Sequence, residues 1–439
     1  ILCLDEGLAI AAYGVLPVRF ESLQQWLEWQ NSYHPTEIDL GLQRVATVWR
    51  RLRTEGVQGK VVTVAGTNGK GSSVALLESI YTRAGITVGC FTSPHLVRYN
   101  ERIRLNGEPV SDRQLCRAFE MIDRAREQIS LSYFEFATLA ALICFAAERP
   151  ELIILEVGLG GRLDAVNIID ADVALITTVD LDHTDWLGDD IETIGREKAG
   201  IIRRRRPVVL GDRAMPQSVL AQAEQLDADI YLSTREFDYR PTPQGWQWRG
   251  PDGEVLELPA PGLTGGRQLQ NASAVVMVCR LLQESFPLQP DLIARGLQQV
   301  RLPGRLQFVA GKPAMLLDVA HNRQSLESLG EALQQLHWQG SVYALFGMLE
   351  DKDAADAVEL IGPYLAGWHL IDLDGWRGRR AEQLAMALRG AEVKQPVSCH
   401  QGFAEAYGAC RDQAGPEDLL LVFGSFRIVG EAMHYLDLA

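Results

Sequence analysis

The chain has 439 residues, 47% of them hydrophobic and 23% charged, a balance that excludes a mainly disordered, collagen-like or coiled-coil protein. A formal net charge of −15 argues against binding to a nucleic-acid backbone, which requires a basic face. No apolar run reaches the roughly 18 residues that a membrane helix needs, and seven cysteines without a CxxC pair predict reduced thiols in a cytoplasmic protein.

Short apolar runs alternate with helix-length segments through most of the chain. The residues before Gly66 have the pattern of two or three helices. Strands rich in Val and Ile, separated by helices, predict βαβ units and a parallel sheet. These strands are predicted at residues 61–65, 88–92, 152–157, 173–179 and 208–210, and the clearest helices at 73–84 and 136–147.

The pattern changes between residues 231 and 258, where two tryptophans and a Pro-Asp-Gly turn predict a short antiparallel segment. A helix is predicted at 270–283, and the Pro-Gly pair at Pro303 predicts a hinge. A second alternating series then supplies strands at 316–319, 342–346, 369–373 and 419–423.

We therefore predict two α/β domains. At about 150 residues per domain, the length allows two or three. Residues 1–302 are expected to form a P-loop ATPase domain with a parallel sheet, and residues 303–439 a smaller Rossmann-like domain.

The strand predicted at 61–65 runs into a glycine-rich segment, Gly-Thr-Asn-Gly-Lys-Gly-Ser, and then into a helix. Such a segment can turn tightly, present backbone amides to phosphate oxygens and bring Lys70 to the terminal phosphates of ATP. Any strand-to-helix turn can be glycine-rich, but strand, Gly-Lys and helix in this order favour a phosphate loop. The residues expected to face ATP are Thr67, Asn68, Gly69, Lys70, Gly71 and Ser72.

This loop lacks the usual hydroxyl for Mg²⁺, because Gly71 follows Lys70 where a Ser or Thr is common. We therefore expect the metal to take ligands from elsewhere. Ser93, Glu156 and His183 each follow or end a predicted strand, and the carboxyl ends of parallel strands share one edge of a sheet. A Ser-Pro turn or a lone histidine is more often structural, whereas a buried carboxylate needs a partner. Together the three favour a Mg²⁺ site, although imidazole is its less usual ligand.

The segment Ala-Gly-Thr-Asn-Gly-Lys-Gly-Ser at 65–72 resembles the ATP loop of the Mur-ligase superfamily, in particular its folate branch. Further stretches resemble the folylpolyglutamate synthase/dihydrofolate synthase family, and the resemblance covers nearly the whole chain. These stretches are residues 92–104, 155–167, 181–201, 302–308 and 317–322. The resemblance implies that a carboxylate of dihydropteroate or a reduced folate attacks ATP, giving an acyl phosphate that the amine of L-glutamate then attacks.

The same resemblance implies roles for individual residues. It places metal ligands on Ser93, Glu156 and His183, with two Mg²⁺ ions, and a carbamylated lysine at Lys198. Carbamylation changes the charge of a lysine from +1 to −1, which could orient a metal site. From the residues alone, a surface salt bridge of Lys198 is the simpler interpretation. We take Lys70, Lys198 and His183 as catalytic, and the family is expected to be monomeric.

Ser132 and Glu135 fit a capping box at a helix start, and the aromatic pair between them suits stacking on a flat heterocycle. The resemblance assigns this segment and three further positions to the pterin-bearing substrate. The residues so assigned are Asp39, Ser132, Tyr133, Phe134, Glu135, Leu163, Asp164 and Ala165.

In the second half, the resemblance implies adenine-, phosphate- and ribose-facing roles for Asn271, Arg305 and Asp318, with His321 in the same cleft. Arg305 in the hinge can reach phosphates only when the two domains close. Asp318 and His321 could instead form a loop-capping pair. Ser425 is assigned to the incoming glutamate. The chain departs from the family pattern at Arg323, where Pro is usual, and at Arg427, where His is common.

Two other classes of function compete with this hypothesis. A peptidoglycan Mur ligase carries a nucleotide-sugar domain before the ATP loop, whereas only 65 residues precede Gly66 here. A P-loop switch or partner-binding NTPase would have a Ser or Thr after Lys70, and this chain has Gly71. The residues leave open whether the acceptor acid is dihydropteroate, a folyl glutamate or both.

Overall fold

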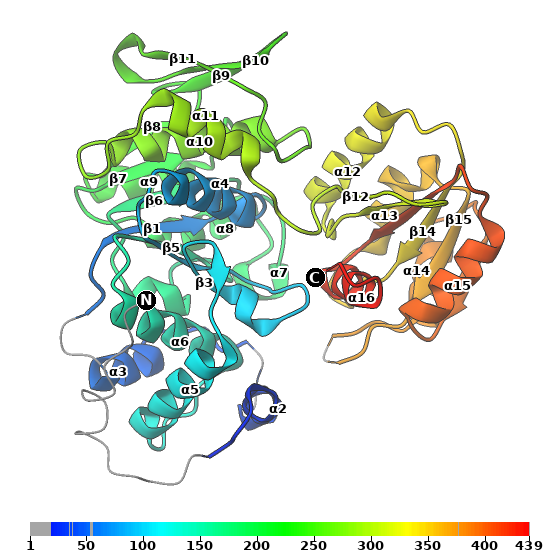
Figure 1. Ribbon diagram of the computed structural model, residues 1–439, viewed down its shortest axis with the longest axis horizontal. Coiled ribbons are helices and arrows are strands. Elements are labelled where there is room, and N and C mark those ends of the chain that lie inside the picture. Colours follow the sequence, from blue (N-terminus) through cyan, green and yellow to red (C-terminus); the bar gives the residue numbers. More distant parts are fainter. Residues whose placement is uncertain (1–18, 35, 37, 53–55, 376, 439) are drawn as a thin grey trace.

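The structure is a computed structural model that describes residues 19–34, 36, 38–52, 56–375 and 377–438. Figure 1 shows two lobes, one built on an eight-stranded sheet and the other on a six-stranded sheet. The chain crosses between them after the helix α11 (Pro290–Gln299) and enters the strand β12 (Gln307–Val309). The domain division at 302 and 303 stays a prediction. None of the described helices has the length and apolar character needed to cross a bilayer.

The large sheet has the strand order β4-β3-β2-β5-β1-β6-β7-β8, and the neighbours β2-β5-β1-β6-β7-β8 are all parallel. Its strands are β1 (Lys60–Ala65), β2 (Val88–Phe91), β3 (Ile103–Leu105), β4 (Glu108–Pro109), β5 (Leu152–Glu156), β6 (Val173–Ile176), β7 (Pro207–Leu210) and β8 (Asp229–Leu232). A parallel sheet was predicted, but β3 and β4 pair antiparallel at one edge. Asn106 and Gly107, both with positive φ, form the tight turn between them, and an Asn-Gly pair favours such a hairpin.

Helices cover both faces of this sheet, which explains why its strands are apolar throughout. Alternate residues of a strand point to opposite faces, so that Val61 joins the core on one side and Val62 the core on the other. One face carries α4 (Lys70–Arg83), α10 (Gln268–Leu281) and α11. The other carries α2 (Leu23–Tyr33), α3 (Gln43–Leu52), α5 (Asp112–Arg126), α6 (Tyr133–Glu148), α8 (Ile191–Lys198) and α9 (Gln217–Gln225).

The predicted antiparallel segment forms a separate small sheet of β9 (Asp238–Thr242), β10 (Gly245–Arg249) and β11 (Val255–Leu258), at the top of Figure 1. Trp246 and Trp248 of β10 are fully buried, and their indole N–H groups donate to the carbonyls of Pro259 and Ser273 at 2.9 and 3.1 Å. The predicted start at residue 231 was wrong, because that residue belongs to the parallel strand β8.

The second lobe has the strand order β12-β13-β17-β14-β15-β16, parallel except for β12. Its other strands are β13 (Ala314–Leu317), β14 (Val342–Phe346), β15 (Gly367–Ile371), β16 (Val397–His400) and β17 (Leu419–Phe423). The strand β16 was missed because only its last residue is buried. One face carries α12 (Arg323–Leu336), α13 (Ala354–Leu360) and α14 (Ala381–Gly390), and the other carries α15 (Phe403–Gln413) and α16 (Phe426–Tyr435).

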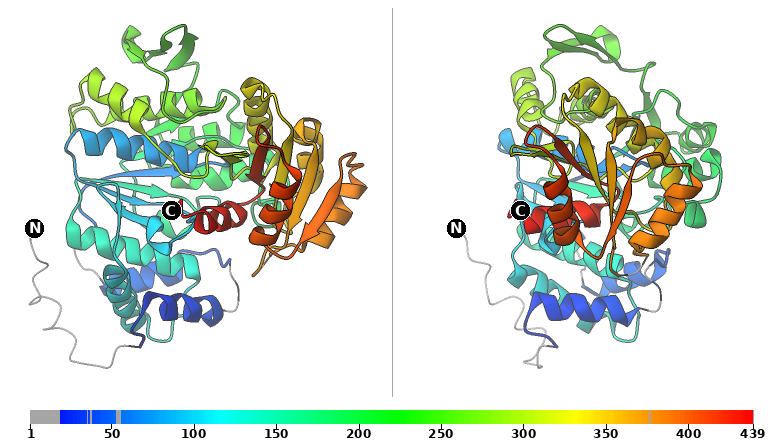
Figure 2. Two further views of the ribbon diagram at one scale, coloured as in Figure 1. Left: turned by 45° about the vertical axis from the view of Figure 1, so that its right-hand side comes forward. Right: turned by 90° about the vertical axis from the view of Figure 1, so that its right-hand side faces the viewer.

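The helix α16 lies where the two lobes meet, as the turned views in Figure 2 show. Leu96 and Val97, from the loop after β2, pack against the apolar cluster that α16 helps to form. Gly430 of α16 allows this contact, because a Cβ there would lie 2.1 Å from the carbonyl oxygen of Leu96. Backbone of the first lobe therefore rests directly on a helix of the second.

Candidate active site

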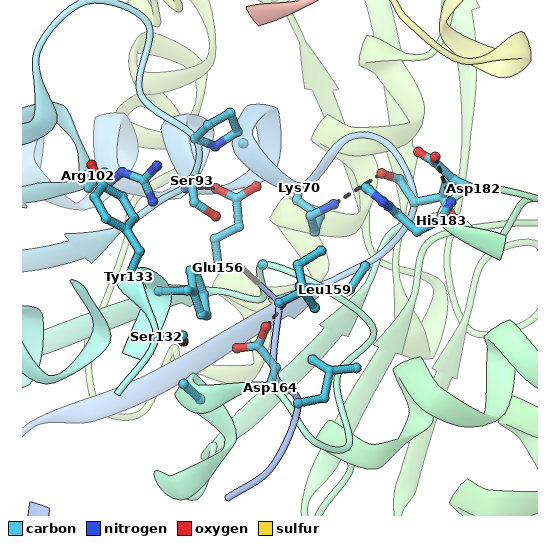
Figure 3. A pocket seen from close by; sticks show the side chains of 18 of the residues that line it. Lys70, Ser93, Arg102, Ser132, Tyr133, Glu156, Leu159, Asp164, Asp182 and His183 are labelled. Carbon is cyan, nitrogen blue, oxygen red and sulfur yellow. Dashed lines mark hydrogen bonds between the residues drawn. The ribbon is translucent and has the colours of Figure 1, made fainter. Parts of the chain in front are cut away.

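The strand order of the large sheet brings the predicted site residues to one edge. The strands β2, β5, β1 and β6 are consecutive neighbours and parallel, so their carboxyl ends lie together. Ser93 follows β2, Glu156 ends β5, the phosphate loop follows β1 and His183 follows β6. In Figure 3, Ser93 and Glu156 lie between Arg102 on one side and Lys70 on the other, with His183 beyond Lys70.

These side chains line one cavity of about 330 Å³ between the lobes. Most of the residues that the sequence analysis assigned to binding ATP, the metal or the pterin line this cavity. The predicted residues that line it are Asp39, Thr67, Asn68, Gly69, Lys70, Gly71, Ser93, Ser132, Tyr133, Phe134, Glu135, Glu156, Leu163, Asp164, Ala165, His183, Arg305 and His321. Residues separated by hundreds of positions in the chain thus face a single volume.

The phosphate loop turns at Gly69, whose φ of 84° is accessible mainly to glycine, and α4 begins at Lys70. A Cβ at Gly69 would lie 2.5 Å from the side-chain oxygen of Asn271, and a Cβ at Gly71 would lie 3.9 Å from Glu156 Oε1. Gly69 therefore allows the loop to approach Asn271 closely, whereas a Cβ at Gly71 would make only ordinary van der Waals contact with Glu156. Lys70 Nζ donates to the carbonyl oxygens of Gly66 and Thr67 at 2.9 and 3.1 Å. Burial lowers the pKa of Lys70, and the nearby carboxylate of Glu156 opposes this.

The three proposed metal ligands fit a divalent cation in their donor chemistry. Glu156 is buried and accepts a hydrogen bond from Ser93 N at 3.2 Å, so these two residues are adjacent. Burial raises the pKa of Glu156, and Lys70 counteracts it. His183 Nδ1 is buried and has no hydrogen-bond partner among the described residues. Burial also lowers the pKa of His183 to about 4, so the imidazole is neutral at pH 7, the form that binds a metal.

No cluster of three or more His, Cys, Asp or Glu side chains suited to a metal occurs in the part of the chain that the structure describes. A Mg²⁺ ion beside Glu156 and His183 would therefore depend also on the hydroxyl of Ser93 and on phosphate oxygens. This agrees with the chemistry of Mg²⁺, which binds proteins through few side chains and shares its remaining positions with phosphate and water.

Lys198 ends α8 and is only 4% exposed, so it is not the surface residue that the salt-bridge interpretation requires. Its neighbour Glu197 pairs instead with Arg162 at 2.8 Å. Gly161 makes room for this segment, because a Cβ there would lie 2.9 Å from the carbonyl oxygen of Lys198. Burial, followed by the charge of Lys70, lowers the pKa of Lys198 to about 7. A lysine with this pKa is largely neutral just above neutral pH.

The residues predicted for the pterin form one wall of the cavity. The capping box at the start of α6 is confirmed, with Ser132 Oγ accepting from Glu135 N at 3.3 Å and Glu135 Oε2 accepting from Ser132 N at 2.8 Å. This cap positions Tyr133 and Phe134, and the Phe134 ring lies 5.7 Å from that of Phe91. The capped helix start is thus a rigid aromatic platform.

Two further segments complete this wall. Asp164 accepts from the backbone N–H groups of Leu159 and Val166 at 2.9 and 3.0 Å, and burial raises its pKa to about 7. Gly41 N donates to the carbonyl of Leu163 at 3.1 Å, which ties the Asp39 segment to residues 163–165. Asp39 itself pairs with Arg44 at 2.8 Å.

A second, smaller cavity between the lobes holds the residues predicted for the nucleotide. The predicted residues that line it are Asn68, Gly69, Ser72, Asn271, Arg305 and Asp318. Asp318 also caps the loop, as the alternative interpretation expected, because its carboxylate accepts hydrogen bonds from Leu306 N and Ala320 N, each at 2.8 Å. Arg305 lines both cavities and links them. Burial lowers the pKa of Arg305, and Asp318 opposes that effect.

The remaining predictions have mixed outcomes. His321 faces the first cavity with its Nδ1 2.7 Å from the carbonyl of Val319, and burial lowers its pKa to about 4. Ser425 is buried and caps α16 by accepting from Ile428 N at 3.3 Å. Ser425 and Lys198 line neither cavity. The assignment of Ser425 to incoming glutamate stays a prediction.

Sequence reasoning missed a polar network that joins the lobes next to the phosphate loop. Asp182 forms an ion pair with Lys352, and both side chains are under 10% exposed. Asn322 Nδ2 donates to Asp182 Oδ2 at 2.8 Å, and Asn68 Nδ2 donates to Gln324 Oε1 at 2.8 Å. Burial alone would raise the pKa of Asp182, but its interactions with His183 and Lys352 hold that pKa below the usual value. No local pattern indicates a pair whose members are 170 positions apart.

The chain matches known proteins over almost its whole length. The family model for the Mur ligase middle domain matches residues 64–279, and that for the Mur ligase glutamate ligase domain matches residues 304–426. The dihydrofolate synthase/folylpolyglutamate synthase of Escherichia coli K12 is 39% identical over 96% of this chain and 97% of its own.

Solved structures agree with this match. Escherichia coli FolC in complex with DHPP and ADP has a TM-score of 0.89 at 40% identity, covering 96% of this chain and 99% of that one. A bifunctional folylpolyglutamate synthase/dihydrofolate synthase with Mn, AMPPNP and L-glutamate bound has a TM-score of 0.87 at 40% identity, with the same coverage. The chain therefore belongs to the dihydrofolate synthase/folylpolyglutamate synthase family, within the Mur ligases.

Proposed function

We propose that the chain is an ATP-dependent ligase that joins L-glutamate to dihydropteroate, to folyl glutamates or to both, in folate biosynthesis and retention. The observation that carries this proposal is the shared cavity, in which the phosphate loop with Lys70 faces the aromatic platform of Tyr133 and Phe134. The relatives support it, since their structures hold DHPP with ADP, or AMPPNP with Mn and L-glutamate. A peptidoglycan substrate is less well supported, since the close relatives are named for folates.

The geometry suits formation of an acyl phosphate. The pterin end of the acid lies against the platform, and its carboxylate points toward the phosphate loop. Lys70 and Arg305 offset the negative charge that gathers when this carboxylate attacks the γ-phosphate of ATP. Mg²⁺ held by Ser93, Glu156 and His183 would polarise phosphate oxygens. Contact between the lobes excludes water that would hydrolyse the acyl phosphate. The amine of L-glutamate then attacks the acyl carbon and displaces phosphate.

The enzyme is expected to act as a cytoplasmic monomer. The residues of both cavities come from the two lobes of one chain, so a second copy is not needed to complete the site. The cysteines of the described residues are unpaired, as is usual for proteins of reducing compartments.

An assay of ADP release tests the function. L-Glutamate should stimulate ADP release in the presence of dihydropteroate or tetrahydrofolate, and not with a muropeptide precursor. Hydroxylamine added during turnover should trap the acyl phosphate as a hydroxamate. Release of AMP in place of ADP, or stimulation by the muropeptide alone, would contradict the proposal.

Lys198 is proposed to carry a carbamate. Only a neutral amine adds CO₂, and burial has lowered the pKa of Lys198 to about 7, so much of it is neutral where an exposed lysine is charged. In ¹³C-bicarbonate at pH 8, the wild-type chain should therefore give a carbamate NMR signal that Lys198→Met abolishes. Lys60→Met, which changes a half-exposed lysine in β1, is the control and should keep the signal. A signal unaffected by Lys198→Met would rule out the assignment.

A further inference from the structure

Arg102 is a buried cation in the main cavity that the reaction described above does not use. It ends the short helix at Tyr99–Arg102, is 8% exposed and lines the cavity. Figure 3 shows its guanidinium directed toward Ser93 and Glu156, with Tyr133 beside it. Its Nε donates to His95 Nδ1 at 2.9 Å. This partner is an imidazole ring and not a carboxylate.

Arg102 takes part in no ion pair within the described residues. Its guanidinium lies beside two aromatic rings that contact each other edge-to-face, 5.4 Å from the ring centre of Tyr99 and 5.3 Å from that of Tyr133. Arg104, two positions later, is different, because Glu78 binds its Nη2 at 2.8 Å and its Nε at 2.9 Å. Aromatic faces attract a cation less strongly than a carboxylate does. A buried arginine that lacks a carboxylate and faces a cavity is suited to an anionic ligand.

The position of Arg102 indicates which anion it would meet. The reacting carboxylate must reach the γ-phosphate, and therefore lies at the end of the cavity where Lys70 and Arg305 supply positive charge. Arg102 lies across Ser93 and Glu156 from Lys70, beside the aromatic platform (Figure 3). It is therefore placed for a second carboxylate, carried by the same substrate a few atoms from the first.

The two acids of the proposed function differ in this respect. Dihydropteroate has a single carboxylate, which is the one that reacts. A folyl glutamate that is to be elongated has two at its end, the reacting γ-carboxylate and an α-carboxylate three carbon atoms away. A cation that binds the second carboxylate therefore assists the elongation of a folyl glutamate. It has no carboxylate to bind when dihydropteroate is the substrate.

We propose that Arg102 binds the α-carboxylate of the terminal glutamate of a folyl substrate, and so determines the preference for chain elongation over addition of the first glutamate. This inference rests on the proposed function and adds a specificity-determining residue to it. The planar guanidinium can hold a carboxylate through two parallel hydrogen bonds, which an ammonium cannot reproduce.

The test compares Arg102→Met, Arg102→Lys and Arg98→Met in the full chain. Arg98 precedes the same short helix, is largely exposed and pairs with Asp112, so it is a matched control outside the cavity. With tetrahydropteroylglutamate, Arg102→Met should lower kcat/KM by about 10- to 100-fold, mainly through KM, as expected for loss of a charged hydrogen bond. With dihydropteroate the loss should stay below about 5-fold. Arg102→Lys should retain part of the activity, and Arg98→Met should behave as wild type.

A substrate analogue gives a second readout. A folyl substrate whose terminal α-carboxylate is replaced by a carboxamide keeps the reacting γ-carboxylate. The wild type should discriminate against this amide by the same factor that Arg102→Met loses, and Arg102→Met should not discriminate. Equal losses with both acids, or discrimination that survives in Arg102→Met, would overturn the inference. If the wild type releases no ADP with either acid, the proposed function itself fails, which is a different result.

Discussion

Replacement of Lys70 by methionine should lower kcat for glutamate-dependent ADP release by about 100- to 1000-fold, with either pterin-bearing acid. The reason lies in its position, because Lys70 is the first residue of α4 and its partly buried ammonium lies near the carboxylate that ends β5. Water is a poor substitute for a cation held at the point where phosphate charge gathers. Steady-state assays with saturating ATP measure the effect on kcat, and titration of ATP separates it from weaker binding.

Lys60→Met is the matched control for this experiment. Lys60 begins β1, the strand that leads into the phosphate loop, but its side chain is 45% exposed and 3.6 Å from Asp172. Surface ion pairs of this kind contribute little. Its activity should stay within about twofold of wild type. If Lys70→Met folds normally and keeps more than about a tenth of the wild-type kcat, Lys70 does not have the proposed role.

Lys352→Met should separate the two lobes. Asp182 and Lys352 form a buried pair across the lobe boundary, and removal of one member leaves the other charge without its partner. Breaking a buried pair typically costs about 3–5 kcal/mol. Because the pair joins the lobes, we expect this cost to reduce the closed population, lowering kcat/KM for ATP by about 100-fold. Small-angle scattering should show a larger radius of gyration than the wild type.

Two variants test whether this effect belongs to the pair. The double variant Asp182→Asn with Lys352→Met removes both charges and should recover part of the closed form, because no uncompensated charge remains. Arg323→Met removes an exposed arginine that pairs with Asp356 and Glu359 inside the second lobe, and should leave the radius of gyration unchanged. A double variant as open as Lys352→Met would show that the ion pair does not hold the lobes together.

Features that depend on neighbours in the chain were predictable. The phosphate loop, the capping box at Ser132 and Glu135 and most strands of both sheets follow from patterns a few residues long, because backbone conformation and capping act over such distances. The edge hairpin at Asn106 and Gly107 was not predicted, although an Asn-Gly pair carries its own turn preference.

Burial of charged groups was not predictable in the same way. Lys198 has the sequence surroundings of a surface residue, and the structure buries it because Gly161 admits its backbone closely. The missing ion pair of Arg102 and the pairing of Asp182 with Lys352 depend on which side chains meet across the fold. Such contacts involve residues far apart in the chain, and their electrostatic energy depends on a desolvation that no local pattern reports.

The sequence by itself determined the fold class, the phosphate loop and, through the family resemblance, the chemistry to be expected. The tertiary structure alone decided that β2, β5, β1 and β6 lie side by side, so that Ser93, Glu156, Lys70 and His183 face one cavity. It also decided that residues of the second lobe, among them His321 and Phe426, complete the lining of that cavity. The physical reason is that strand order and lobe contact follow from packing of the whole chain, whereas loops and caps follow from a few adjacent residues.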